Sequence, residues 1–304
     1  MTSTGCTECD KTTPPCPRYD RSRLGTKLAF LKNGTCSKTL MTVLDSAFGH
    51  PLPHEEHATN PLAGGLMRGY QCGMLWGSTL AAGAAAYRHY GPGPDATAAA
   101  MRAATRLVPA FRAQNNHINC LEIIEVDPRG GWQTFKHFFI KGGTFVCMRR
   151  AADFAPIAME RINAALTASD TGTGCSAPMS CAARVAEEMG ANRMHQAMAA
   201  GLAGGIGFSG GACGALGAAI WLTGIRGRET GDKARVTRGK IEALVERFLK
   251  QTDYEFECAD IVGKRFDGIA DHSAYVGSGG CARLIEALST AEDRAPDAEV
   301  RRSA

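Results

Sequence analysis

The sequence lacks the signatures of several large functional classes. Basic and acidic residues number 34 and 30 in a chain of 304, so no strong positive excess marks a nucleic-acid-binding surface. No P-loop and no nucleophile elbow occur. One GxGxxG pattern runs over 205–210, but no acidic ribose partner follows a predicted strand there, so a dinucleotide site is not indicated. A globular chain with one large or two ordinary domains remains.

The chain also lacks an obvious leader and an uninterrupted membrane span. No basic region followed by an apolar stretch opens the sequence, so we expect no signal peptide and a cytoplasmic protein. Residues 199–225 carry no charge over 27 positions, which is long enough to span a bilayer. Nine of them are glycine, five within 204–211, and this cluster breaks the run into short pieces. We predict closely packed, buried helices there and no membrane span.

Glycine and cysteine are what the chain has in excess, with 36 and 12 residues. In a reducing compartment, cysteines at organised spacings are more often metal ligands or redox thiols than structural disulfides. Their spacing is organised, because the chain repeats itself. Residues 107–111 and 120–124 match 244–248 and 258–262 in order and chemistry, and a glycine lies four residues before both Cys147 and Cys281.

The repeat defines the predicted domains. A polar tail with cysteines (1–23) precedes a first module (24–165) and a second module (166–291), and a polar tail (292–304) follows. Cysteine intervals are 36, 48 and 27 residues in the first module, and 38, 45 and 23 in the second if Cys175 opens it. Differences of a few residues are typical of loops. We therefore predict two homologous modules that arose by duplication.

Apolar residues recur at helical spacing in both modules. After Cys36, Ser37 can cap a helix that ends at Gly49, and its counterpart runs from about Pro178 to Gly190. Further apolar stripes follow over 241–249 and 284–288. Alternating strand patterns are weak, although 134–146 can accommodate a short strand. We predict an all-α fold of two tandem modules with glycine-rich, closely packed helices.

Four cysteines per module are the usual complement for an iron–sulfur cluster and also for a closed zinc site. Helix starts and glycine turns around them would favour thiolates, because backbone N–H groups and the positive helix end lie near sulfur. Neither repeated set contains the paired C-x2-C knuckles of zinc ribbons. The spacing places iron–sulfur binding ahead of thiol redox chemistry, with zinc third.

The second module carries a more specific pattern. A glycine-rich segment, Gly210-Gly211-Ala212-Cys213-Gly214-Ala215, is followed by Cys258 and Cys281. This arrangement resembles the redox-active proteins named for their C…GCAxxG…C…C signature, and the first module resembles a diverged copy with Met74 in place of the signature alanine. The resemblance covers nearly all of 30–291. It implies a redox prosthetic group such as an iron–sulfur cluster, and likeness to a domain of split-Soret cytochromes favours [2Fe–2S].

The sequence thus predicts an iron–sulfur electron-transfer protein with one cluster per module and a redox partner protein. The expected ligands are Cys36, Cys72, Cys120 and Cys147, then Cys175, Cys213, Cys258 and Cys281, with Cys181 as the alternative to Cys175. A metal-free thiol–disulfide oxidoreductase and a zinc-stabilised scaffold remain as alternatives. The sequence does not decide whether the chain is itself an enzyme within an oxidoreductase system. It also leaves the oligomeric state open.

Two further groups of candidates rank lower. Cys6, Cys9 and Cys16 lie in the polar tail without a fourth partner in sequence, so spare thiols are the first interpretation. His137 and His272 precede equivalent cysteines by ten and nine residues. Helix packing is the simpler account of these histidines, and cluster ligation is the alternative.

Overall fold

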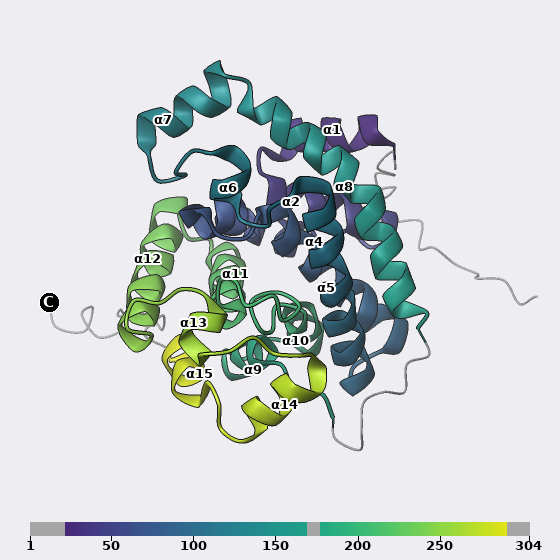
Figure 1. Ribbon diagram of the computed structural model, residues 1–304, viewed down its shortest axis with the longest axis vertical. Helices are drawn as coiled ribbons and strands as arrows, with labels where there is room; N and C mark the ends of the chain where they lie inside the picture. The colour runs from purple at the N-terminus through teal and green to yellow at the C-terminus, as the bar shows by residue number, and fades with distance from the viewer. Residues whose placement is uncertain (1–21, 169–176, 291–304) are drawn as a thin grey trace, which may run out of the picture.

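The computed structural model describes residues 22–168 and 177–290, and every regular element in these ranges is helical (Figure 1). The first module contains α1 (Arg23–Asn33), α2 (Cys36–Ala47), α3 (Pro53–Ala58), η1 (Asn60–Leu62), η2 (Gly65–Gly69), α4 (Gly73–Tyr90), α5 (Pro94–Asn115), α6 (Cys120–Ile124), α7 (Gly131–Phe135), η3 (Lys136–Ile140) and α8 (Gly143–Leu166). The second contains α9 (Cys181–Glu188), α10 (Arg193–Ala200), α11 (Gly214–Glu229), α12 (Ala234–Gln251), α13 (Cys258–Val262), α14 (Ile269–Gly277) and α15 (Ala282–Ser289). The predicted all-α fold is confirmed.

The order of helices repeats between the modules. Helices α2 and α9 both begin at a cysteine, α4 and α11 both follow one directly, and the short helices α6 and α13 both begin at one. Long helices α5 and α12 occupy the same place in the order. In Figure 1 the first module, coloured purple to teal, lies above and beside the second, coloured green to yellow. The predicted duplication is therefore visible in the architecture.

Local contacts explain the start of α9 and correct two predictions. Ser180 accepts a hydrogen bond from the Ala183 N–H at the start of α9, as an N-cap residue should. Ser37 does not cap α2, because it lies inside the helix and its hydroxyl donates to the Thr59 carbonyl. The possible strand over 134–146 is also absent, since this segment forms α7, η3 and the start of α8.

Small residues let the helices of the two modules approach closely. A Cβ atom on Gly83 of α4 would lie 2.4 Å from the Ala197 carbonyl oxygen of α10, and one on Gly217 of α11 would lie 2.1 Å from the Trp76 ring of α4. Trp76 and Trp221 are fully buried in a core that runs through both modules. The predicted glycine-rich close packing thus joins the modules into one core.

The uncharged segment 199–225 is part of this core. It contains the end of α10, a glycine-rich turn and most of α11, and most of its residues are buried. Among the helices of the described ranges, none is both long and apolar enough to cross a membrane.

Candidate cysteine sites

Each module places four described cysteines at or near the starts of helices. In the first module Cys36 and Cys120 are the first residues of α2 and α6, Cys72 is the N-cap of α4, and Cys147 lies near the start of α8. In the second module Cys181 and Cys258 begin α9 and α13, while Cys213 and Cys281 are the N-caps of α11 and α15. Backbone groups of these helix starts bond to the thiols of Cys36, Cys72, Cys181 and Cys213, where the positive helix end favours a thiolate.

A left-handed turn precedes the second cysteine of each module. Residues 64–67 and 204–208 all have φ between 56° and 75°, and Leu66, Met67, Ile206 and Phe208 adopt this conformation without being glycine. Such a backbone costs about 1–2 kcal/mol per non-glycine residue. Two copies of the same costly turn at equivalent positions indicate that the surrounding structure fixes the turn.

These turns supply backbone hydrogen bonds to sulfur. The backbone of Gly64 bonds to Cys36, and the backbone of Gly204 bonds to Cys181. A Cβ on Gly73 would lie 2.7 Å from Cys36 Sγ, so this glycine leaves room for the sulfur atom. In the second module, the glycines within 204–207 indicated a turn from the sequence alone. In the first module, Leu66 and Met67 gave no such indication, because they are not glycine.

The thiols of the first module interact with one another. A hydrogen bond with Cys72 lowers the pKa of Cys36 to about 7 and raises that of Cys72 well above its usual value. Burial raises the pKa of Cys120, and burial with repulsion from Cys36 raises that of Cys147 to about 12. Within the described chain, all four predicted cysteines of this module therefore belong to one electrostatic group.

The thiols of the second module form a second group. Burial, followed by repulsion from Cys213 and Cys281, raises the pKa of Cys181. Burial raises the pKa of Cys213 to about 12, and burial with repulsion from the other three thiols raises that of Cys258. The Cys281 thiol also interacts with the Tyr275 side chain. Buried thiols that repel one another in this way become thiolates more easily when a cation lies among them.

Equivalent backbone pairings hold the second and third cysteines of each module together. The Cys72 N–H donates to the Ile118 carbonyl and the Cys120 N–H to the Tyr70 carbonyl, at 2.8 and 2.6 Å. In the second module the same exchange joins Cys213 to Phe256 and Cys258 to Gly211, at 3.0 and 2.7 Å. Each exchange forms an isolated antiparallel bridge, Gln71 with Asn119 and Ala212 with Glu257.

The two bridges also contact each other across the module junction. The buried Gln71 amide donates to the Gly205 carbonyl at 2.8 Å and accepts from the Ala212 N–H at 2.7 Å. The rings of Tyr70 and Phe256 stack with centroids 4.3 Å apart and planes 3° apart. Thus residues beside Cys72 support the loop that carries Cys213.

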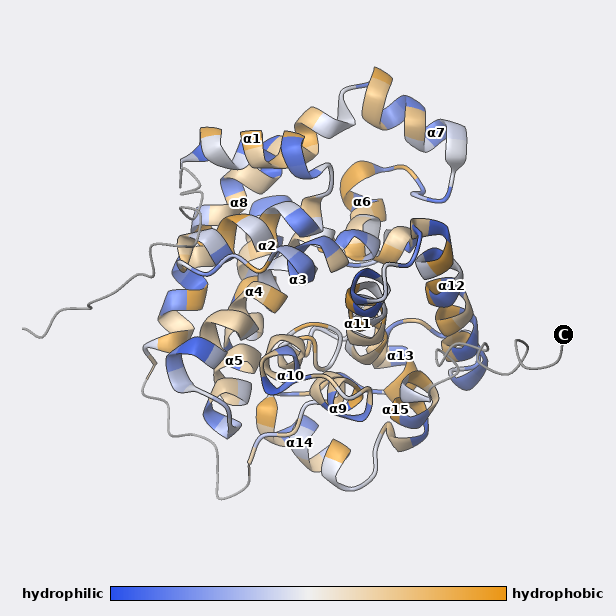
Figure 2. Ribbon diagram, turned by 180° about the vertical axis from the view of Figure 1, so that it is seen from behind, coloured by the Kyte–Doolittle hydropathy of each residue, from blue (hydrophilic) through white to orange (hydrophobic). Residues whose placement is uncertain are grey.

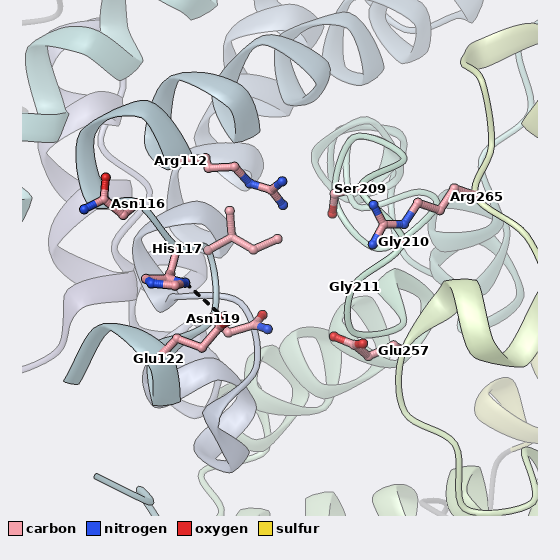
Figure 3. Close-up of a pocket in the computed structure, with 11 residues that line it drawn as sticks. Arg112, Asn116, His117, Asn119, Glu122, Ser209, Gly210, Gly211, Glu257 and Arg265 are labelled. Atoms are coloured by element: carbon pink, nitrogen blue, oxygen red, sulfur yellow. Dashed lines mark ion pairs between the residues drawn. The ribbon is translucent and has the colours of Figure 1, made fainter. Parts of the chain in front are cut away.

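A polar cavity of about 300 Å³ lies at this junction (Figure 3). The side chains of Arg112 and Arg265 enter it from opposite modules, and His117 and Glu122 form an ion pair of 3.3 Å on one wall. The remaining lining residues are Asn116, Ile118, Asn119, Ser209, Gly210, Gly211 and Glu257. Since Cys120 and Cys258 follow lining residues directly, the cavity lies beside both cysteine groups.

Some predicted residues stay outside these groups. Cys6, Cys9, Cys16 and Cys175 lie outside the described residues. His272 is buried, and its Nδ1 hydrogen-bonds with the Met179 carbonyl at 3.0 Å, which is a packing role. His137 packs against Gly143 instead of forming part of the thiol group described above.

The ligand atoms and the surroundings of the cysteines have the chemistry that an iron–sulfur cluster needs. Each described group offers four sulfur donors and backbone hydrogen bonds to sulfur, and in the first module Gly73 also leaves space beside Cys36. However, no three His, Cys, Asp or Glu side chains within 22–168 and 177–290 are arranged to hold a metal ion. The groups therefore provide the ligand chemistry without already surrounding a single ion.

Fold and site together define a duplicated, all-α protein with four cysteines per module. A family model described as "Putative redox-active protein (C_GCAxxG_C_C)" matches residues 35–161 and again 174–292. The chain belongs to this family, and the double match confirms the predicted family and internal duplication. No curated protein and no solved structure matches the chain.

Proposed function

We propose that the protein is an iron–sulfur electron carrier in which each module binds one cluster. The proposed ligands are Cys36, Cys72, Cys120 and Cys147 in the first module, and Cys181, Cys213, Cys258 and Cys281 in the second. The observation that carries the proposal is the repeated grouping of four interacting thiols beside a left-handed turn. We choose Cys181 over Cys175 because Cys181 begins α9 as Cys36 begins α2.

The chain's own residues would hold and tune the group. When bound, an iron–sulfur cluster supplies reversible one-electron transfer. The backbone N–H groups from the turns and helix starts stabilise negative charge on sulfur, and burial of five of the eight cysteines limits access of water. A redox partner protein would supply or remove the electron, and the reduced thiols that this function needs agree with the expected cytoplasmic location. The cluster type expected from the sequence, [2Fe–2S], remains part of the proposal.

Anaerobic purification and reconstitution test the proposal through iron, labile sulfide and visible absorption. We expect a coloured protein whose cluster absorption falls by about half in Cys181→Ser, since one of two clusters loses a ligand. Cys175→Ser is the matched control and should retain its absorption. A colourless wild-type protein that takes up no iron would refute the proposal, and the reverse result for the two variants would refute the choice of Cys181.

A second candidate function rests on the hydrogen-bonded pair Cys36 and Cys72. The Cys36 thiolate could attack a disulfide of an oxidised partner and form a mixed disulfide, which releases one partner thiol. Attack by Cys72 would then release the second partner thiol and leave a Cys36–Cys72 disulfide, so two electrons pass to the partner. Thiol titration of metal-free protein before and after a reductant tests this function. An unchanged count excludes it.

The zinc-stabilised scaffold stays a third candidate, because four thiolates also suit a closed zinc site. Stoichiometric zinc in the purified protein and unfolding on chelation would distinguish it.

A further inference from the structure

Large apolar side chains are exposed where the first module leads into its fourth cysteine. Trp132 is 69% exposed and Phe139 is 75% exposed, and neither α7 nor η3 buries any residue. We call the exposed set the apolar ridge: Trp132, Phe135, Phe139, Ile140, Phe145 and Val146. The Trp132, Phe135 and Phe139 rings stack in series, with centroids 5.5 and 4.9 Å apart. A contiguous exposed patch of this kind is typical of an interaction surface.

The equivalent segment of the second module does not expose its apolar side chains in this way. Its α14 occupies the equivalent position before Cys281, yet His272 of α14 is only 1% exposed. The α14 helix packs against Met179, Phe208 and Phe266 through its hydrogen bond and ring contacts. The first module therefore carries a different sequence at the same place, and this sequence is directed toward solvent.

The charged residues within the segment that carries the apolar ridge are all basic, and acidic Asp127 and Asp153 flank this segment. Residues 128–152 include five arginines and lysines and no acidic residue. Arg129 is paired with Asp127 and Arg149 lies 4.0 Å from Asp153, whereas Lys136 and Lys141 form no ion pair within the described chain. Both lysines are exposed beside the apolar side chains. An apolar surface with this rim attracts a negatively charged partner.

Helix α1 adds a second apolar and basic element at the same end of the molecule. Leu24, Leu28 and Leu31 recur at helical spacing and are all exposed. The helix contains three basic residues and no acidic one. Both views place α1 and α7 at one end of the long axis, with α7 at the extremity (Figures 1 and 2). Helix α1 packs on α8, the helix that follows the ridge in the chain, so both elements lie at one end of the molecule, which we treat as one candidate docking face.

We propose that this face docks the protein on an anionic lipid bilayer without spanning it. Exposed tryptophan, phenylalanine and leucine with flanking lysines form the usual composition of an interfacial membrane anchor. Protein interfaces, in contrast, are depleted of lysine. The aromatic side chains are also exposed on a segment at one end of the molecule, where they can enter the headgroup region. Docking would bring the Cys147 end of α8 near the bilayer, and it does not depend on which group the cysteines bind.

Vesicle flotation of the full-length protein tests the proposal. The probes are phosphatidylcholine vesicles with and without about 30 mol % phosphatidylserine, because anionic lipid attracts basic segments. We expect binding to the anionic vesicles, with a blue shift of tryptophan emission. This shift reports Trp132, since the other two tryptophans, Trp76 and Trp221, are fully buried.

Two variants and a control assign the binding to this face. Trp132→Ser/Phe139→Ser should lower partitioning at least about tenfold, because two apolar side chains no longer enter the bilayer. Lys136→Glu/Lys141→Glu should lower it by about tenfold or more, and so should high salt. Val236→Ser/Tyr254→Ser removes exposed apolar side chains from the second module and should change nothing.

Absence of vesicle binding by the folded wild-type protein would overturn the proposal. If that protein is instead a dimer that Trp132→Ser/Phe139→Ser dissociates, a second copy covers the face. If it binds only an acidic electron-transfer protein such as a ferredoxin, the face is a protein-docking site. Vesicle binding that survives both variants would also contradict the assignment to this face. Each of these results can arise whether or not the cysteines bind clusters.

Discussion

Replacing Gln71 by alanine should weaken the junction between the modules. Its amide is buried and makes two hydrogen bonds to the second module, with Gly205 and Ala212. The Gly205 carbonyl keeps the Ser209 hydroxyl as a donor, but the Ala212 N–H loses the Gln71 side-chain oxygen as its acceptor. A buried N–H without a partner costs about 1–3 kcal/mol, and the smaller side chain also leaves a gap. We expect Gln71→Ala to lower the free energy of unfolding by about 2–3 kcal/mol.

Urea unfolding followed by circular dichroism measures this loss. The matched control is Gln251→Ala at the end of α12, where the side chain is exposed and a change within about 0.5 kcal/mol is expected. Because Ala212 precedes Cys213, the same variant should weaken iron retention in the second module more than in the first. Equal stability of Gln71→Ala and Gln251→Ala would refute the role assigned to the junction.

Two other substitutions test buried charge and backbone strain. Burial, and then the nearby Glu56, raise the pKa of Asp45 well above its usual value, so the folded state holds a proton that the unfolded state releases. The free energy of unfolding of the wild-type protein should therefore fall relative to that of Asp45→Asn as pH rises above about 4. Urea unfolding at several pH values measures both. If the two free energies change with pH in parallel, the buried protonated carboxyl is contradicted. Met67→Gly should raise the free energy of unfolding by about 0.5–1 kcal/mol, because Met67 is half exposed and adopts a positive φ that glycine adopts without strain. A lower free energy of unfolding in the same assay would show that the packing of Met67 outweighs the strain.

The sequence predicted what repeats along the chain. The helical spacing of apolar residues was sufficient to predict the all-α fold, and the recurring cysteines were sufficient to predict the duplication. Both signals can be read directly from the order of residues along the chain. The interval argument gave Cys175 as the opening cysteine, with Cys181 as the alternative. Cys181 lies at a helix start, as Cys36 does, whereas Cys175 lies outside the described residues, so the choice of Cys181 stays a prediction. Loop length varies freely between copies, so intervals alone could not choose between them.

Tertiary contacts account for what the sequence could not predict. The left-handed conformation of Leu66 and Met67 contradicts their local preference and requires the surrounding packing. Tyr70 and Gln71, which add bulk next to Cys72, turn out to contact the second module. Ser37 satisfies a distant carbonyl instead of its own helix start. Each of these depends on residues far apart in the chain.

Iron content of single-module variants tests the central claim most directly. Cys120→Ser and Cys258→Ser each remove one proposed ligand, from the first and second module respectively. After anaerobic reconstitution, each variant should hold about half of the wild-type iron and sulfide, and the double variant almost none, since each cluster depends on four thiolates. Full iron content in either single variant, or loss of all iron in both, would contradict one independent cluster per module.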